Sequence, residues 1–275
     1  MTQSLIEKSR WLRKELFNIV VKSGKGHFPS SSSCADFIIG LFYKNFINLN
    51  PNNLNSRSRD RIIISKGHAA MVLYPILADL GFFPKKELEN FCKPEGLLRM
   101  YADNTIPGIE SITGSLGHGL GIGAGYCLAA KRDNIDFKTY VVIGDGECYE
   151  GSVWETAMFA SHHKLNNLIA VVDKNELCIM GKTEELITLG SLESKWEAFG
   201  WNVFSIDGHK YSEIIPTLRD IKNSNTEQPT AIILNTVKGK GVSFMEGQHL
   251  WHNRMPNEGE TKQALKELEK GCIFQ

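Results

Sequence analysis

The sequence lacks an excess of either charge, because 31 lysine and arginine residues balance 31 aspartate and glutamate residues. A balanced chain has no broad electrostatic attraction to nucleic acid or to an anionic membrane. It also lacks an apolar run approaching the length of a membrane span, and its amphipathic first helix lacks the apolar stretch of a signal peptide. We therefore expect a soluble, cytoplasmic protein that binds neither nucleic acid nor membrane.

Paired cysteines of the CxxC kind are missing as well. The six cysteines are scattered, at Cys34, Cys92, Cys127, Cys148, Cys178 and Cys272. Most lie beside apolar residues, which is typical of reduced thiols and argues against a disulfide framework or a zinc site. Repeats and low-complexity linkers are absent. With 275 residues and 42% hydrophobic content, the chain can form one large domain or two small ones.

The sequence does contain alternating strand and helix patterns. Runs rich in β-branched residues predict strands at 61–65, 139–143, 167–173, 202–207 and 230–237. Helices are expected at 4–22, from Ala35 after a serine run that caps it, and at 66–81, 119–132, 151–165, 192–200, 212–222 and 260–270. This alternation predicts an α/β fold, an open, mainly parallel sheet with helices on both faces.

The strand at 139–143 runs directly into Gly144-Asp145-Gly146. Ligands of open α/β sheets bind beyond the carboxyl ends of the strands. Asn175 follows the next strand, one strand–helix–strand unit later, so both side chains emerge at the same edge if the strands are neighbours. A carboxylate, an amide oxygen and a backbone carbonyl just beyond Asn175 would form an oxygen cluster, which suits Mg²⁺ or Ca²⁺.

The two glycines have two interpretations. Gly144 and Gly146 would let the backbone approach a diphosphate near a helix N-terminus. Alternatively, Gly-Asp-Gly is a tight turn whose aspartate caps the next helix. The motif alone favours the turn, whereas its combination with polar residues at the next strand end favours a ligand site.

Residues 144–175, GDGECYEGSVWETAMFASHHKLNNLIAVVDKN, resemble the thiamine diphosphate motif in its transketolase version. Further stretches resemble transketolase motifs in the same order along almost the whole chain: SGKGHFPSSSSCADFI at 23–38, ISKGHAAMVLYPIL at 64–77, PGIESITGSLGHGLGIGAG at 107–125 and KGKGVSFMEGQHLWHN at 238–253. The resemblance implies one thiamine-diphosphate-binding domain of the diphosphate type over residues 1–275.

The resemblance also implies roles for individual residues. The cofactor-binding residues would be His68, Gly117, Gly144, Asp145, Gly146, Glu147, Asn175, Leu177 and His252. The metal ligands, for Mg²⁺ with Ca²⁺ as an alternative, would be Asp145, Asn175 and the carbonyl of Leu177.

The catalytic residues would be His27, His68, His252 and Glu150, since histidine exchanges protons near neutral pH. The simpler interpretation of His27 and His68 is a turn histidine beside a glycine. Glu150 and Glu155 would lie at a dimer interface; the simpler interpretation is a solvated first helical turn.

The remaining histidines and one glycine-rich stretch give little indication of function. His162 and His163 are expected to pack or to face solvent, and His118 and His249 remain undecided. Residues 119–124 fit the dinucleotide fingerprint GxGxxA, but no strand precedes them, so we interpret these glycines as close helix packing.

The chain matches only the first of three transketolase domains. The resemblance therefore implies a separate chain that carries the pyrimidine-binding and C-terminal domains, in an α2β2 assembly. An inactive remnant or a fragment is the alternative. The start methionine and the charged last helix favour a natural subunit.

The function implied is transfer of a two-carbon ketol unit from a ketose to an aldose, with sugars or sugar phosphates as substrates. One departure concerns specificity. Residues 100–102 read Met-Tyr-Ala where most transketolases carry Gly-His-Pro, and Tyr101 or Asp103 would supply a polar substitute. This departure favours, as an alternative, ketol or acyl transfer onto an unusual sugar in a biosynthetic pathway. Two weaker hypotheses are a non-catalytic protein on the same fold and one chain of a 2-oxo acid dehydrogenase.

Overall fold

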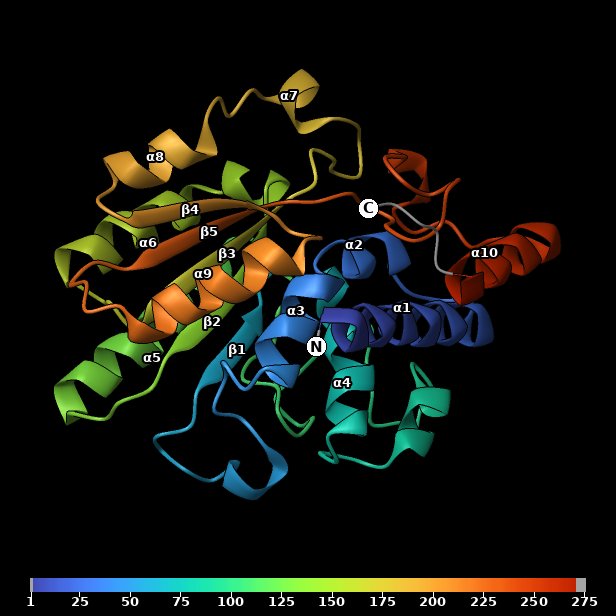
Figure 1. Ribbon diagram of the computed structural model, residues 1–275, viewed down its shortest axis with the longest axis horizontal. Coiled ribbons are helices and arrows are strands. Elements are labelled where there is room, and N and C mark those ends of the chain that lie inside the picture. The colour runs from blue at the N-terminus through green and yellow to red at the C-terminus, as the bar shows by residue number, and fades with distance from the viewer. Residues whose placement is uncertain (1, 271–275) are drawn as a thin grey trace.

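The computed structural model describes residues 2–270. Five strands form one sheet in the order β1-β2-β3-β5-β4 (Figure 1). They are β1 (Arg61–Ile64), β2 (Thr139–Gly144), β3 (Leu168–Lys174), β4 (Asn202–Asp207) and β5 (Thr230–Asn235). All four pairings are parallel, and β2 pairs directly with β3, as the candidate ligand site requires.

The α-helices of the described residues are α1 (Thr2–Ser23), α2 (Phe28–Ser33), α3 (Ala35–Tyr43), α4 (Leu73–Asp79), α5 (His118–Asp133), α6 (Gly151–His162), α7 (Thr183–Leu186), α8 (Leu192–Ala198), α9 (Tyr211–Asn223) and α10 (Glu258–Lys270). Short 3-10 helices are η1 (Pro51–Asn53), η2 (Gly67–Val72), η3 (Lys85–Asn90), η4 (Gly146–Tyr149) and η5 (His249–Trp251). None of these helices is long and apolar enough to cross a membrane.

Three predicted helices differ in detail. The serine run before Ala35 is itself the buried helix α2 rather than only a cap. The segment 66–81 begins as the 3-10 helix η2 and becomes α-helical only at Leu73. The helix expected at 151–165 ends at His162, and Lys164 adopts a left-handed φ of 50°.

Alternate strand residues divide the core between the two faces of the sheet. On β2, Tyr140 and Val142 pack in the cluster that contains α1, α3, α4 and α9, and Val141 and Ile143 pack in the cluster that contains α5, α6 and α8. Strands buried on both faces read as continuous apolar runs. The predicted α/β fold with helices on both faces is confirmed (Figure 1).

The glycines of residues 119–124 pack closely, as predicted. A Cβ at Gly123, in α5, would lie 2.6 Å from Val141 Cγ2 of the sheet. The cysteines also match their prediction: the five described ones are free thiols, while Cys272 lies outside the described residues.

Candidate active site

Three histidines from distant parts of the chain meet in one cluster. His27 precedes α2, His68 lies in η2, and His252 follows η5. Their ring centroids are 5.4 Å apart for His27 and His68, 5.2 Å for His27 and His252, and 5.0 Å for His68 and His252. The structure therefore brings together all three histidines that the motifs had singled out.

Burial keeps this cluster neutral. Desolvation lowers the pKa of His27, lowers that of His68 well below its usual value, and lowers that of His252 to about 3. The nearby ammonium of Lys238 shifts all three in the same direction. The Nδ1 atoms of His27 and His252 are buried and have no hydrogen-bond partner within residues 2–270. These two nitrogens are available to a ligand.

Asp145 and Asn175 lie at the same edge of the sheet, as predicted. Gly144 is paired with Asp173 across β2 and β3, so Asp145 and Asn175 each follow the paired ends. Asp145 accepts hydrogen bonds from the amides of Gly146 (2.8 Å) and Glu176 (2.6 Å). Burial and the neighbouring Asp173 raise the pKa of Asp145 to about 6.

Asn175 and Leu177 complete the predicted ligand set. Asn175 Oδ1 accepts from the Leu177 amide at 3.3 Å, and the Leu177 carbonyl accepts from Lys238 Nζ at 3.0 Å. No three His, Cys, Asp or Glu side chains in the described part of the chain are arranged to hold a metal. A metal at Asp145 would therefore need the amide and carbonyl oxygens beside it, as an oxygen-ligand cation allows.

Asp173 is a central residue that the sequence analysis missed. This fully buried carboxylate accepts from Lys66 Nζ (2.6 Å), Ser33 Oγ (2.6 Å), Asn175 Nδ2 (2.8 Å) and Thr236 Oγ1 (2.5 Å). Burial disfavours its charge, but Lys66 and these donors hold its pKa below the usual value. The signal in the sequence was a lone acid closing an apolar strand.

Lys238 was missed as well, although it lies in one of the transketolase-like stretches. The residue is 2% exposed, and burial lowers the pKa of its ammonium to about 8. No carboxylate within the described residues lies at ion-pair distance from it, and its ammonium donates to the Leu177 carbonyl. Asp145 and Asp173 act on this ammonium only from beyond ion-pair distance, so it is suited to an anionic ligand.

Glu147 and Gly117 serve the architecture of this edge. Glu147 is buried and accepts from Ser65 Oγ and from the amides of Gly117 (2.8 Å) and Gly144 (3.1 Å). Gly117 has φ 82°, and a Cβ there would lie 2.5 Å from Ser152 Oγ. These contacts occupy both carboxylate oxygens of Glu147, and its predicted contact with a cofactor remains a prediction.

Gly144 and Gly146, the two glycines of the motif, differ in the room that each leaves for a side chain. A Cβ at Gly144 would meet nothing closer than 3.9 Å, whereas one at Gly146 would lie 3.2 Å from Cys178 Cβ. A Cβ at Gly144 would therefore fit in ordinary contact with Lys66 and Glu147. Asp145 also caps η4, so the turn interpretation and the ligand interpretation are both compatible with the geometry.

Glu150 and Glu155 are exposed, Glu150 directly before α6 and Glu155 within it. The same helix exposes 53% of Met158 and 41% of Phe159. His162, in the same helix, is exposed, and its ring meets that of His163 edge to face. The predicted interface role of the two glutamates remains a prediction.

Tyr101 and Asp103, the two candidates to replace the histidine of the Gly-His-Pro stretch, differ in whether their side chains are already engaged. Asp103 Oδ1 accepts from the amide and the hydroxyl of Thr105, so it closes a turn. Tyr101 is 46% exposed, and its ring lies 3.5 Å from the position of a Cβ on Gly114. Gly67, which precedes His68, packs against the backbone of Thr113, next to Gly114.

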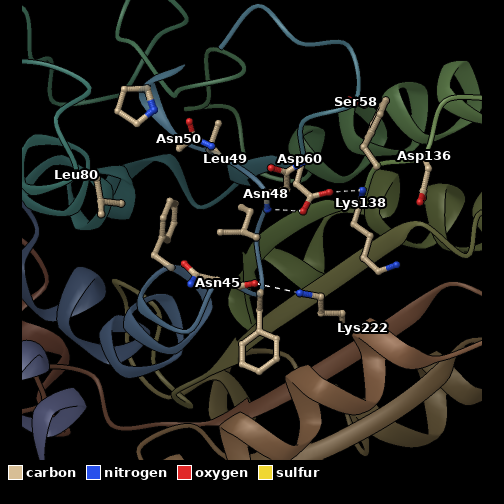
Figure 2. A pocket seen from close by; sticks show the side chains of 15 residues that line it. Asn45, Asn48, Leu49, Asn50, Ser58, Asp60, Leu80, Asp136, Lys138 and Lys222 are labelled. Carbon is tan, nitrogen blue, oxygen red and sulfur yellow. Dashed lines mark hydrogen bonds between the residues drawn. The ribbon is translucent and has the colours of Figure 1, made fainter. Parts of the chain in front are cut away.

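A cavity of about 640 Å³ lies elsewhere, at the amino ends of the strands (Figure 2). Asp60 accepts there from the amides of Asn48 and Lys138, both at 2.7 Å, and Lys222 Nζ donates to the Asn45 carbonyl at 3.2 Å. The Asp60 contacts tie the loop before β1 to the start of β2, and the Lys222 contact ties α9 to the segment after α3. The residues that carry the predicted chemistry lie at the opposite edge.

A parallel sheet that gathers a carboxylate, an amide and neutral histidines beyond its strand ends defines a ligand-binding α/β enzyme domain. The chain belongs to the transketolase family: residues 2–270 match the family model described as transketolase, thiamine diphosphate binding domain. The family and the enzyme class predicted from the sequence motifs are thereby confirmed.

Relatives of similar length are named as subunits. The chain is 40% identical over 256 residues to an apulose-4-phosphate transketolase subunit of Phocaeicola vulgatus, a match covering 93% of this chain and 90% of that one. It is 40% identical over 260 residues to a 6-deoxy-6-sulfo-D-fructose transketolase subunit of a Clostridium species, covering 94% of each. These names agree with the predicted function, one subunit of a two-chain transketolase.

Single-chain transketolases are longer. The crystal structure of transketolase from Campylobacter jejuni superposes with a TM-score of 0.89 at 32% identity, over 97% of this chain but 43% of that one. The human enzyme is 34% identical, and 42% of its length is covered. The chain therefore spans less than half of these proteins.

Proposed function

We propose that this chain is the diphosphate-binding subunit of a two-chain transketolase that moves a two-carbon ketol unit from a ketose to an aldose. The observation that carries the proposal is the cluster of His27, His68 and His252 at the sheet edge that bears Asp145 and Asn175. The subunit-sized relatives support the division into two chains.

Several features fit thiamine diphosphate. Lys238 offers a buried ammonium with no carboxylate at ion-pair distance in the described part of the chain, and the missing side chain at Gly144 would let a ligand approach the backbone. Ser30 Oγ, like the Nδ1 atoms of His27 and His252, is buried without a partner within residues 2–270. Buried polar atoms of this kind are normally satisfied, so a polar ligand would complete them.

The proposed metal is Mg²⁺, with Ca²⁺ as the alternative, held by Asp145, Asn175 and the Leu177 carbonyl. Oxygen ligands of this kind suit either cation when it also binds phosphate oxygens. The raised pKa of Asp145 supports the proposal, because burial and Asp173 disfavour its charge and a bound cation would offset both effects.

The three histidines would bind the sugar hydroxyls and transfer protons. Thiamine diphosphate supplies the nucleophilic carbon that makes cleavage of the bond beside a ketone feasible. The neutral rings of His27, His68 and His252 can each accept or donate a hydrogen bond to a sugar hydroxyl. The unpaired Nδ1 atoms of His27 and His252 are the positions at which a proton would be held or passed. Glu150, the other proposed catalytic residue, would act at the subunit boundary.

A separate chain would supply the remaining transketolase domains, in an α2β2 assembly. Exposed apolar side chains on this subunit include Met158, Met180 and Ile187, of which Met180 is 77% exposed. Glu150 and Glu155 would lie against a neighbouring subunit. We propose the cytoplasm as the compartment, in keeping with the free thiols of the described cysteines.

The proposed substrates are sugars or sugar phosphates. Two relatives are named for apulose-4-phosphate and 6-deoxy-6-sulfo-D-fructose, which are uncommon sugars. Together with Tyr101 at the place of the usual histidine, these names favour an unusual sugar over the common pentose phosphates. Good activity on ordinary pentose phosphates would count against this part of the proposal.

Calorimetric titration tests the proposal, with thiamine diphosphate and Mg²⁺ added to the chain alone and then to the chain with its candidate partner. We expect binding that appears or tightens with the partner and is lost in Asp145→Ala. Turnover with the partner would exclude a non-catalytic protein on this fold. An absence of binding in both states would leave Gly144-Asp145-Gly146 as a capping turn only.

A further inference from the structure

His209, which none of the sequence motifs included, bridges two parts of the molecule. It lies between β4 and α9, and its Nε2 accepts a hydrogen bond from the backbone amide of Val237 at 2.9 Å. Its Nδ1 lies 2.7 Å from Asp36 Oδ2 in α3. A ring nitrogen that accepts a hydrogen bond carries no proton, so the ring proton must reside on Nδ1 and point to Asp36. The contacts thus select one neutral tautomer.

A buried arginine fixes the other side of Asp36. Arg13 donates to Asp36 through NH1 (2.9 Å) and NH2 (2.6 Å), and NH2 also donates to the Ser32 carbonyl (3.0 Å). Burial disfavours the carboxylate, but Arg13 and His209 hold its pKa well below the usual value. A bidentate pair of this kind has a defined geometry. Arg13, Asp36 and His209 therefore form a rigid chain of contacts from α1 to Val237.

Val237 matters because Lys238 follows it. After β5 the Thr236 amide donates to the Lys174 carbonyl at 3.1 Å, and the Gly239 amide donates to the Pro29 carbonyl at 3.0 Å. Between these backbone anchors, the Val237 amide is held by a side chain, His209. The Lys238 ammonium then reaches the Leu177 carbonyl at the candidate metal site.

We propose that His209 is a positioning residue: through the Val237 amide it fixes the backbone from which Lys238 reaches the diphosphate of the cofactor. This inference rests on the proposed function for the ligand, but the contact itself does not depend on any ligand. A group that orients a binding residue affects affinity without touching the ligand.

The first test needs no cofactor. In the full chain labelled with ¹⁵N, the Nε2 of His209 should show the shift of an unprotonated nitrogen at neutral pH, and the Val237 amide should exchange slowly with solvent. A protonated Nε2 would overturn the inference. In His209→Leu the Val237 amide should exchange faster, and unchanged exchange would also overturn it.

The second test measures affinity. In the presence of the partner chain, His209→Leu should weaken binding of thiamine diphosphate with Mg²⁺ by about tenfold or more, a typical loss for an orienting group. His209→Gln can still present an acceptor to Val237 and should recover part of that affinity. Lys238→Met should show at least the loss seen in His209→Leu.

The matched control is Tyr211→Phe. Tyr211 lies two residues from His209, and its hydroxyl contacts Ser9 Oγ and the Leu5 carbonyl, not Val237. This variant should lower the melting temperature yet bind the cofactor as the wild type does. Equal affinity losses in Tyr211→Phe and His209→Leu would show that the effect of His209 is on stability alone, and would overturn the inference. If the wild type itself binds no cofactor, the proposed function fails, and the exchange data alone decide the placement of Val237.

Discussion

Lys66 Nζ lies 2.6 Å from Asp173 Oδ2, and the two side chains are 3% and 0% exposed. Their ion pair joins η2, which carries His68, to the end of β3, which precedes Asn175. The two halves of the candidate site are therefore connected by a buried charge pair. Such a pair is costly to break, because removal of one partner leaves the other charge buried.

Lys66→Met should accordingly destabilise the chain by about 3–5 kcal/mol in the free energy of unfolding, measured by urea denaturation. The control is Lys164→Met, which removes an exposed pair with Glu227 and should cost no more than about 1 kcal/mol. Equal costs for the two variants would show that the buried pair contributes no more than a surface one.

The histidine cluster predicts how stability depends on pH. The pKa of His252 is about 3 in the folded chain and about 6.5 when unfolded, so between these values the unfolded state binds more protons. Stability is therefore expected to fall as the pH drops through this window. His252→Gln should lose less stability between pH 7 and pH 4 than the wild type does, as followed by thermal unfolding.

The control for this pH effect is His162→Gln, which removes an exposed histidine of α6. Its pH profile should match that of the wild type. Parallel profiles for the wild type and His252→Gln would contradict the assignment of a neutral, buried ring at His252.

The sequence predicted those parts of the site that follow from strand ends. Asp145 and Asn175 terminate apolar strands one unit apart, and parallel topology alone brings them to one edge. The three histidines were recognisable only through the resemblance of their motifs. The fold class followed from the alternation of strands and helices.

The roles of Asp173, Lys238 and His209 were missed in the sequence analysis for a common physical reason. A charged or polar residue at the end of a strand or in a turn reads as solvated unless distant segments cover it. Asp173 is buried by Ser33 and Lys66, more than a hundred residues away in sequence, and His209 meets Asp36 across 173 residues. Local patterns carry no information about such partners.

Two glycines of the site should respond differently to alanine. Gly144→Ala should fold normally, with a change of no more than about 1 kcal/mol, because a Cβ there has room. It should nonetheless weaken binding of thiamine diphosphate, measured by calorimetry with the partner present, because the methyl group would fill the space beside the backbone.

Gly117→Ala should instead destabilise the chain itself. Its φ of 82° costs a residue with a side chain about 1–2 kcal/mol, and the Cβ would also press on Ser152 Oγ and Glu150 Cβ. Normal stability in Gly117→Ala, or an unchanged cofactor affinity in Gly144→Ala, would contradict this division between a structural and a ligand-facing glycine.

Tyr101 is expected to govern which sugar the enzyme prefers. Its side chain is 46% exposed and free to meet a substrate, whereas Asp103 is engaged with Thr105. Tyr101→Phe removes only the hydroxyl, so kcat/KM for the preferred sugar should fall about tenfold, the value of one hydrogen bond, while stability stays unchanged.

Tyr101→His restores the residue type usual at this place, and it should raise the ratio of kcat/KM for ordinary pentose phosphates to that for the preferred sugar. The matched control is Asp103→Asn, which should loosen the turn at Thr105 and leave the ratio unchanged, because that side chain points into the turn. Both kinetic constants should be measured on the two-chain enzyme with cofactor present. A ratio that moves with Asp103→Asn but not with either Tyr101 variant would place the specificity in the turn rather than in the tyrosine. A site built to hydrogen-bond one hydroxyl discriminates strongly against sugars that lack it, so the ratio is the sensitive quantity.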